Sequence, residues 1–192
     1  MLYRVFAAST DRRPDPFAVP RHFQGGGRHD NPDHYTALYL AREPISAVAE
    51  RIQGFRGQRL TEGVFARPDG RVDALAEIDD AGWPELVDLD DPDVLATRQI
   101  RPSRVATADR SITQGLALGL FLAGAPGLCW WSTLEASWTN VTVFEERLAP
   151  ALRRVVRVEP LTVAHPLVRD AADHLLIDVP RPRLRRVGPH RA

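Results

Sequence analysis

The chain has 192 residues, enough for one domain with a substantial core. Its 25 basic and 25 acidic residues cancel, so bulk electrostatics do not favour direct contact with nucleic acid. The single cysteine, Cys129, excludes an internal disulfide and fits a reducing cytosol. There is no signal-peptide pattern at the N-terminus, and no apolar run reaches the ~20 residues that a membrane span needs. We therefore expect a soluble, cytoplasmic protein with no membrane partner.

Apolar periodicity predicts strands and helices in mixed order along the chain. The first strand, Leu2–Ala7, carries Arg4 between apolar neighbours, and residues 9–24 read as an ordered loop or lid. Two further runs, 63–67 and 72–78, flank the turn signal at 68–70 and predict a hairpin or strand pair. Other strands are expected at 37–41, 86–89, 128–131, 140–144 and 155–158, and helices at 45–55, 107–123 and 165–176, with a short one beginning at Pro92.

Residues 1–180 show no internal boundary, so we expect them to form a single domain. The segment from Asp73 to Asp93 is acidic, and such runs are usually solvated surface. After Pro180 the chain becomes rich in arginine and proline. We expect this tail, residues 181–192, to be mobile.

The stretch from Gly25 to Glu50 combines three chemical devices. A run of three glycines allows close approach of the backbone to a ligand, and the planar fork of Arg28 suits phosphate oxygens. A buried strand followed by a helix should bring Tyr39 and Glu50 near the same end of this motif. An anion holder, an aromatic platform and a carboxylate together predict a site for a nucleotide sugar.

Two of these candidate residues have ordinary structural interpretations. A buried arginine needs a partner, so Arg4 could simply form a structural salt bridge or a strand-edge charge. Glu50 falls off the buried stripe of its helix, so it could be a solvated surface carboxylate. Both interpretations stay open at the level of the sequence.

Common catalytic and metal-binding patterns are absent. The six histidines lack helical metal-ligand spacing, and His29 and His34 with neighbouring Asp30 and Asp33 fit a polar loop better than a metal site. We find no P-loop, no G-x-S-x-G elbow and no strand–GxGxxG–helix unit. Cleavage of the nicotinamide–ribose bond of NAD passes through an oxocarbenium-like transition state, so its site needs a carboxylate to stabilise the positive charge on the ribose. Such a site also needs arginine for the pyrophosphate and an aromatic face for the base. No metal is expected.

At these residues the sequence resembles the RES-domain family, whose members are toxins of bacterial toxin–antitoxin pairs. The family pattern has a tyrosine–arginine strand, a glycine–glycine–arginine turn that leads to asparagine–proline, a tyrosine strand, and a helix with an alanine and a glutamate. A later helix after a serine, and a strand ending in serine and followed by an asparagine, complete it. The matching residues are Tyr3-Arg4, Gly26-Gly27-Arg28, Asn31-Pro32, Tyr39, Ala47, Glu50, Ser111, Ser132 and Asn140.

The chain departs from this pattern at two places. His29 stands where family members usually have tryptophan, and Asp30 is inserted before the asparagine. The proline usual before the final serine is Trp131. These departures affect the loop that should contact a base, but they leave the arginine, tyrosine and glutamate positions intact.

The resemblance implies an α+β fold: a single domain with a split, mixed β-sheet related to ADP-ribosyltransferases and flanking helices. It implies that NAD is the substrate, consumed by hydrolysis, phosphorolysis or transfer of ADP-ribose to a protein. Arg4, Tyr39 and Glu50 would be catalytic, with Tyr39 stacked on nicotinamide and Glu50 stabilising the oxocarbenium ion. Arg4 and Arg28 would hold the pyrophosphate and ribose. The remaining NAD-binding positions would be Gly27 and either Ser111 or Ser132.

The resemblance also implies a partner: an antitoxin that covers the active site and carries any contact with DNA. One alternative is a non-catalytic nucleotide-binding or interaction module with the same fold. A second mapping, onto secreted ADP-ribosylating toxins, would use Arg4, Ser132-Thr133 and Glu145-Glu146. This mapping gives no role to the stretch from Gly25 to Glu50, so we rank it lower.

Overall fold

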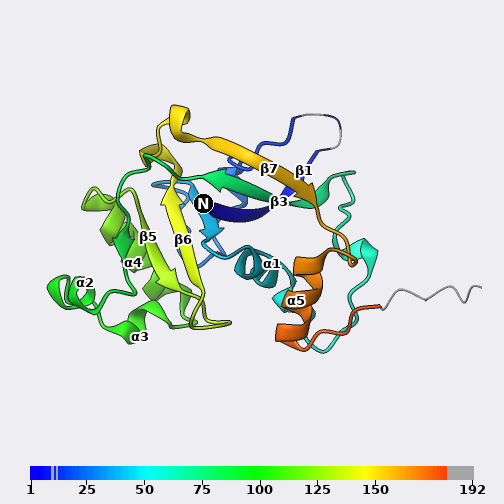
Figure 1. Cartoon of the computed structure of the whole chain (residues 1–192). Coiled ribbons are helices and arrows are strands. Elements are labelled where there is room, and N and C mark those ends of the chain that lie inside the picture. Colours follow the sequence, from blue (N-terminus) through cyan, green and yellow to red (C-terminus); the bar gives the residue numbers. More distant parts are fainter. Residues whose placement is uncertain (10, 12, 181–192) are drawn as a thin grey trace, which may run out of the picture.

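A computed structural model describes residues 1–9, 11 and 13–180 of the chain. Its strands are β1 (Leu2–Ala8), β2 (Ala37–Ala41), β3 (Val72–Asp79), β4 (Val87–Asp88), β5 (Gly127–Trp131), β6 (Thr139–Phe144) and β7 (Arg154–Pro160). They form one seven-stranded sheet in the order β4-β5-β6-β2-β1-β3-β7 (Figure 1). The sheet is mixed, because β4 runs parallel to β5 while the other neighbours are antiparallel.

The sheet opens between its two central strands. β1 pairs with β3 over its whole length, and β2 pairs in the same way with β6. β1 and β2 share a single pair, Tyr3 with Ala41. The sheet therefore divides into two halves, β4-β5-β6-β2 and β1-β3-β7, and this is the split mixed sheet expected from the resemblance.

Helices gather in two groups, one for each half of the sheet (Figure 1). The helices are α1 (Pro44–Ile52), α2 (Pro92–Thr97), α3 (Pro102–Val105), α4 (Arg110–Leu122) and α5 (Pro166–Leu175). Short 3-10 turns lie at Arg21–Phe23, Gln53–Phe55, Glu62–Val64, Glu145–Arg147 and Pro150–Leu152. α1 and α5 pack together with residues of β1 and β3, whereas α2, α3 and α4 share a core with β5 and β2.

The helices that bound the site form for local reasons. α1 begins with Pro44, whose fixed φ suits the first helical position, and buries Val48, Ala49 and Ile52 on one face. α4 begins after Asp109, whose carboxylate accepts a 2.9 Å hydrogen bond from the Ser111 backbone N–H. The predicted helices and most of the predicted strands are confirmed.

Of the hairpin or strand pair predicted for 63–67 with 72–78, the second strand is confirmed as β3, but the first strand is wrong. Residues 62–64 form a 3-10 turn, and only an isolated bridge joins Ala66 to Val72. β3 pairs instead with β1 and β7, which lets it bury side chains on both faces of the sheet. Long-range pairing thus overrides the local turn signal. The predicted mobile tail, 181–192, lies outside the described residues.

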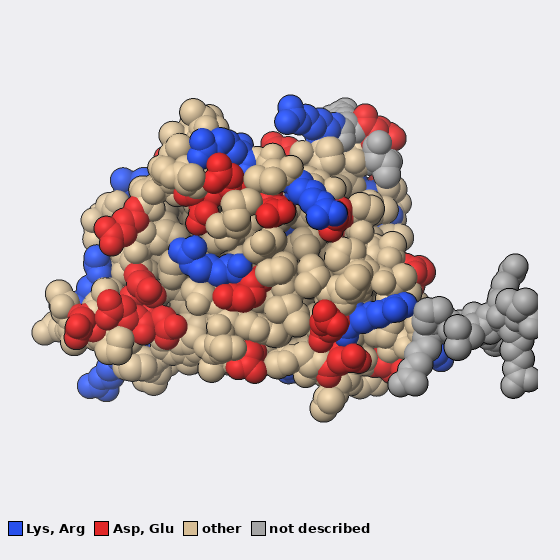
Figure 2. Space-filling view, viewed as in Figure 1, with Lys and Arg blue, Asp and Glu red and all other residues tan. Residues whose placement is uncertain are grey.

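The surface carries both signs of charge. Figure 2 shows acidic and basic side chains interspersed over one face, with an acidic group beside α2. The second part of the acidic segment is exposed as expected, at Asp88, Asp90, Asp91 and Asp93. Its first part is not solvated surface, because it forms the buried strand β3 and Asp73 is fully buried there. None of the helices in the described ranges is long and apolar enough to cross a membrane.

Candidate active site

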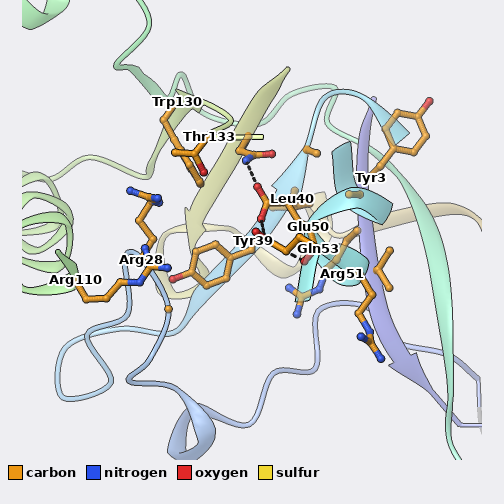
Figure 3. Close-up of a pocket in the computed structure, with 16 residues that line it drawn as sticks. Tyr3, Arg28, Tyr39, Leu40, Glu50, Arg51, Gln53, Arg110, Trp130 and Thr133 are labelled. Carbon is orange, nitrogen blue, oxygen red and sulfur yellow. Dashed lines mark hydrogen bonds between the residues drawn. The ribbon is translucent and has the colours of Figure 1, made fainter. Parts of the chain in front are cut away.

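A pocket of about 360 Å³ lies where the two halves of the sheet part. β1, β2, α1, the glycine loop and the start of α4 all contribute to its walls (Figure 3). Five of the seven residues predicted for the site line it: Arg4, Gly27, Arg28, Tyr39 and Glu50. Residues that are far apart in the sequence therefore meet at one cavity.

Glu50 stands in the last turn of α1 with its carboxylate held from both sides. Oε1 accepts hydrogen bonds from Asn140 Nδ2 at 3.0 Å and from Ser132 Oγ at 3.3 Å. Oε2 accepts one from Gln53 Nε2 at 2.6 Å (Figure 3). Glu50 is half-buried, so it is not the solvated surface carboxylate of the alternative interpretation.

Asn140 has a defined amide orientation. Its Oδ1 accepts a 2.9 Å hydrogen bond from Ser46 Oγ, which leaves Nδ2 as the donor to Glu50. Asn140 and Ser46 are both buried, so this chain of hydrogen bonds is largely shielded from water. The structure thus fixes the Glu50 carboxylate against β6.

The hydroxyl of Tyr39 is engaged by the glycine loop. It donates a 2.6 Å hydrogen bond to Asp30 Oδ1 and accepts a 2.9 Å bond from the His29 backbone N–H. Burial and the bond to Asp30 raise the pKa of Tyr39 well above its ordinary value. The hydroxyl is therefore neutral and already hydrogen-bonded, so the part of Tyr39 available to a ligand in the pocket is its ring.

Asp30, three residues after Gly27, shapes the glycine turn. Its Oδ2 accepts hydrogen bonds from the backbone N–H groups of Gly25, at 2.8 Å, and Gly27, at 2.7 Å. A Cβ atom on Gly27 would lie 2.5 Å from the Tyr39 hydroxyl and 2.6 Å from Asp30 Oδ1. Only glycine fits at position 27 without moving both groups.

α4 secures the loop from the other side. Thr113 Oγ1 donates a 2.5 Å hydrogen bond to the Arg28 carbonyl, and Gln114 Nε2 donates to the carbonyls of Gly25 and Gly27.

His29 is buried, with Nδ1 2.8 Å from Thr142 Oγ1. Burial, together with the nearby charges of Arg28 and Arg110, lowers the pKa of His29 to about 3. His29 is therefore a neutral core residue.

Arg28 is a cation held by neutral groups. Its Nη1 donates to the carbonyls of Val105, at 3.2 Å, and Thr107, at 2.7 Å. The guanidinium lies over the Trp130 ring, 4.9 Å from the centroid. Burial, and then the nearby charge of Arg110, lower the pKa of Arg28, although its charge is not cancelled by an ion pair among the described residues.

Arg4 reaches the pocket through the split in the sheet. Its Nε and Nη1 atoms are fully buried and have no hydrogen-bond partner among the described residues. Burial lowers its pKa to about 10, against the opposing effects of Glu145 and Asp15. The structural salt bridge considered from the sequence is not found in the described part of the chain, and an unpaired buried cation favours an anionic ligand.

The two serine candidates occupy different places. Ser132 is buried and contacts Glu50 directly, but it is not among the residues that line the pocket. Ser111 is exposed and donates its hydroxyl to Asp109 at 2.7 Å, outside the pocket. Glu145 and Glu146, from the second mapping, also lie outside it: Glu145 pairs with Arg153, and Glu146 accepts from the Thr36 N–H.

Sequence reasoning gave no role to several residues of the site. Asn140 had a usable signal, because it matches the asparagine of the family pattern, although the sequence gave no task for it. The positions of Gln53, Trp130 and Arg110 depend on tertiary packing and had no such signal. Among the described residues, no cluster of three or more His, Cys, Asp or Glu side chains could hold a metal ion.

The fold and this site define a family. The model of the RES domain matches residues 1–168, so the chain belongs to the RES-domain family. Among solved structures, it is similar to a chain in the crystal structure of the M. tuberculosis MbcT–MbcA toxin–antitoxin complex. The TM-score is 0.59 at 19% sequence identity, and the match covers 92% of this chain and 87% of that chain. A search of curated proteins found no match.

Proposed function

We propose that this protein is the toxin of a toxin–antitoxin pair and that it consumes NAD by breaking the nicotinamide–ribose bond. One observation carries the proposal: a single pocket holds an oriented carboxylate, Glu50, together with an aromatic ring and unpaired arginines. Membership of the RES-domain family and the similarity to a chain of a toxin–antitoxin complex support it.

The proposed chemistry assigns each residue a task. Loss of nicotinamide leaves positive charge on the ribose, and Glu50 stabilises that charge as it develops. Asn140, Ser132 and Gln53 hold the carboxylate in place, so little reorganisation is needed during the reaction. The ring of Tyr39 supplies a stacking face for nicotinamide.

The arginines bind the other half of the substrate. Arg4 and Arg28 carry positive charge into a partly buried cavity without a carboxylate partner among the described residues. In such surroundings charge-assisted hydrogen bonds to phosphate are strong. The pyrophosphate and the ribose hydroxyls of NAD are the groups we assign to these two side chains.

The acceptor of the ADP-ribosyl group is water, inorganic phosphate or a protein side chain. These three acceptors correspond to hydrolysis, phosphorolysis and ADP-ribosylation. All three share the first bond-breaking step, and Glu50 serves that step in each case.

Induction in a host cell tests the proposal. We expect growth arrest and a fall in cellular NAD within minutes to hours of induction, with neither effect from Glu50→Gln at equal expression. Normal growth and normal NAD with well-expressed wild-type protein would overturn the proposal and favour a non-catalytic module.

A cytoplasmic NAD-consuming enzyme needs restraint in its own host, so we also propose an antitoxin that covers the pocket. A carboxylate of the partner could occupy the space near Arg4 and Arg28 in place of pyrophosphate. Co-expression with the product of each neighbouring gene should restore growth in one case and yield a stable complex on purification. Failure of both neighbours to bind or to restore growth would contradict this part of the proposal.

A further inference from the structure

Arg110, the first residue of α4, lines the pocket beside Arg28 (Figure 3). Its side chain has no ion pair or side-chain hydrogen bond within the described ranges. The adjacent carboxylate, Asp109, is committed to the backbone N–H and the hydroxyl of Ser111. Arg110 therefore brings a second uncompensated positive charge to the Arg28 side of the cavity.

The position of Arg110 is unfavourable for the free protein in two ways. A positive side chain at the start of a helix opposes the positive end of the helix dipole. Arg110 also repels Arg28, whose pKa it lowers. An anion between the two guanidinium groups would relieve both effects.

An independent observation in the same pocket also indicates an anionic ligand. Arg4 has two fully buried nitrogen atoms with no hydrogen-bond partner among the described residues. Arg51, a further arginine of the lining, already has an ion-pair partner in Asp73 at 2.5 Å, a carboxylate that it shares with Arg67. Among the described residues, Glu50 is the one carboxylate that lines the pocket, and it is held by Asn140 and Gln53. Figure 3 shows the Tyr39 ring between Glu50 and the Arg28–Arg110 side.

We infer that Arg110 and Arg28 together bind a phosphate group of the substrate, so that the pocket selects dinucleotides with a pyrophosphate over nucleosides. Arg110 is then a substrate-binding residue outside the family motif. The inference rests on the proposed function, since it concerns the same pocket and the same substrate. Arg28 is fixed by two carbonyls and Trp130, whereas Arg110 is exposed and free to close over a bound phosphate.

The test compares Arg110→Gln with Arg104→Gln. Arg104 is an exposed arginine on α3 that does not line the pocket, so both variants lose one positive charge from neighbouring helices. Binding of ADP-ribose and of nicotinamide riboside is measured by calorimetry at low and high salt, and KM and kcat are measured for NAD.

We expect Arg110→Gln to weaken ADP-ribose binding and raise KM for NAD, each about tenfold, with kcat little changed. It should flatten the salt dependence of ADP-ribose binding. Binding of nicotinamide riboside, which has no phosphate, should not change. The melting temperature of the ligand-free protein should stay equal or rise. Arg104→Gln should behave as wild type throughout.

If the wild-type protein consumes NAD but Arg110→Gln leaves KM and ADP-ribose affinity unchanged, the inference is overturned and the proposed function stands. Equal loss of both ligands in Arg110→Gln would also overturn it, because the effect would then be general. Wild-type protein that neither binds ADP-ribose nor consumes NAD would overturn the proposed function, and the inference with it.

Discussion

Asn140 Nδ2 donates a 3.0 Å hydrogen bond to Glu50 Oε1 and thereby links the start of β6 to the last turn of α1. A hydrogen bond to a charged group contributes about 1.5–3 kcal/mol. Loss of that much transition-state stabilisation lowers the reaction rate about ten- to hundredfold. If the bond orients Glu50 for the transition state, Asn140→Ala should lower kcat by about this factor and leave KM for NAD nearly unchanged.

Ser46→Ala is the matched comparison for this prediction. It removes the 2.9 Å bond that orients the Asn140 amide but keeps the contact between Asn140 and Glu50 possible. We expect a smaller loss of kcat than for Asn140→Ala. Steady-state kinetics of the two variants measure these losses of kcat. An Asn140→Ala variant with wild-type kcat would show that Glu50 does not need this hydrogen bond.

The glycine loop offers a pair of variants that differ by one position. Gly27→Ala would put a methyl group 2.5 Å from the Tyr39 hydroxyl, whereas a Cβ on Gly26 meets nothing within 4 Å. Overpacking of this kind typically costs about 1–3 kcal/mol. We expect Gly27→Ala to lower the melting temperature and raise KM for NAD, and Gly26→Ala to change neither. If the two variants have the same melting temperature and the same KM, position 27 is not in close contact with the Tyr39 hydroxyl, and the prediction is wrong.

His29 should make stability depend on pH. Its pKa is about 3 in the folded protein against an ordinary value of 6.5, because the ring is buried beside Arg28 and Arg110. Between these two pH values the unfolded chain binds a proton that the folded protein does not, so stability falls as the pH falls through this window. From pH 7 to pH 5 the loss from His29 alone should be about 2 kcal/mol.

Urea unfolding at pH 7 and pH 5 measures this effect. His29→Gln removes the titrating group, so the difference between the two pH values should shrink by about 2 kcal/mol. An unchanged difference in the variant would mean that other groups cause the pH dependence. His34, an exposed histidine of the same loop, provides the control substitution His34→Gln.

Arg4 should show opposite effects on stability and function. Replacing a buried, unpaired charge with an apolar side chain of similar length should stabilise the ligand-free fold by about 1 kcal/mol or more. In a protein of this size that corresponds to a rise of about 2–4 °C in melting temperature. We expect Arg4→Met to be more stable than wild type yet unable to bind NAD. A less stable Arg4→Met variant would indicate that Arg4 has a structural role.

Much of the fold was predictable because the signals were local. The alternation in Leu2–Ala8, the acidic cap before α4 and the prolines that open α1, α2 and α5 are all readable in the sequence. The hairpin at 63–78 failed because the partners of β3 are distant in sequence, and a turn signal cannot reveal them. Register across the sheet is set by which faces become buried, and that is a property of the whole fold.

The candidate site was likewise predictable only where its residues lie close together in the sequence. The glycines, Arg28, Tyr39 and Glu50 lie within one short stretch, so their association could be inferred from spacing and from the family resemblance. The support for Glu50 from Asn140, and the approach of Arg110 to Arg28, join segments separated by 82 or more residues. The sequence predicted a stacking role for the ring of Tyr39, but it gave no sign that Asp30 engages the hydroxyl.

Incubation of purified protein with NAD, with and without inorganic phosphate, tests the central claim most directly. Products are identified by chromatography and mass spectrometry, with Glu50→Gln as the matched variant. We expect wild type to release nicotinamide, and Glu50→Gln to keep its fold but lose turnover by a factor on the order of 10² or more. A second product that appears only with phosphate would identify phosphorolysis. Turnover of NAD by Glu50→Gln at near the wild-type rate, or no nicotinamide release by wild type under either condition, would contradict the account.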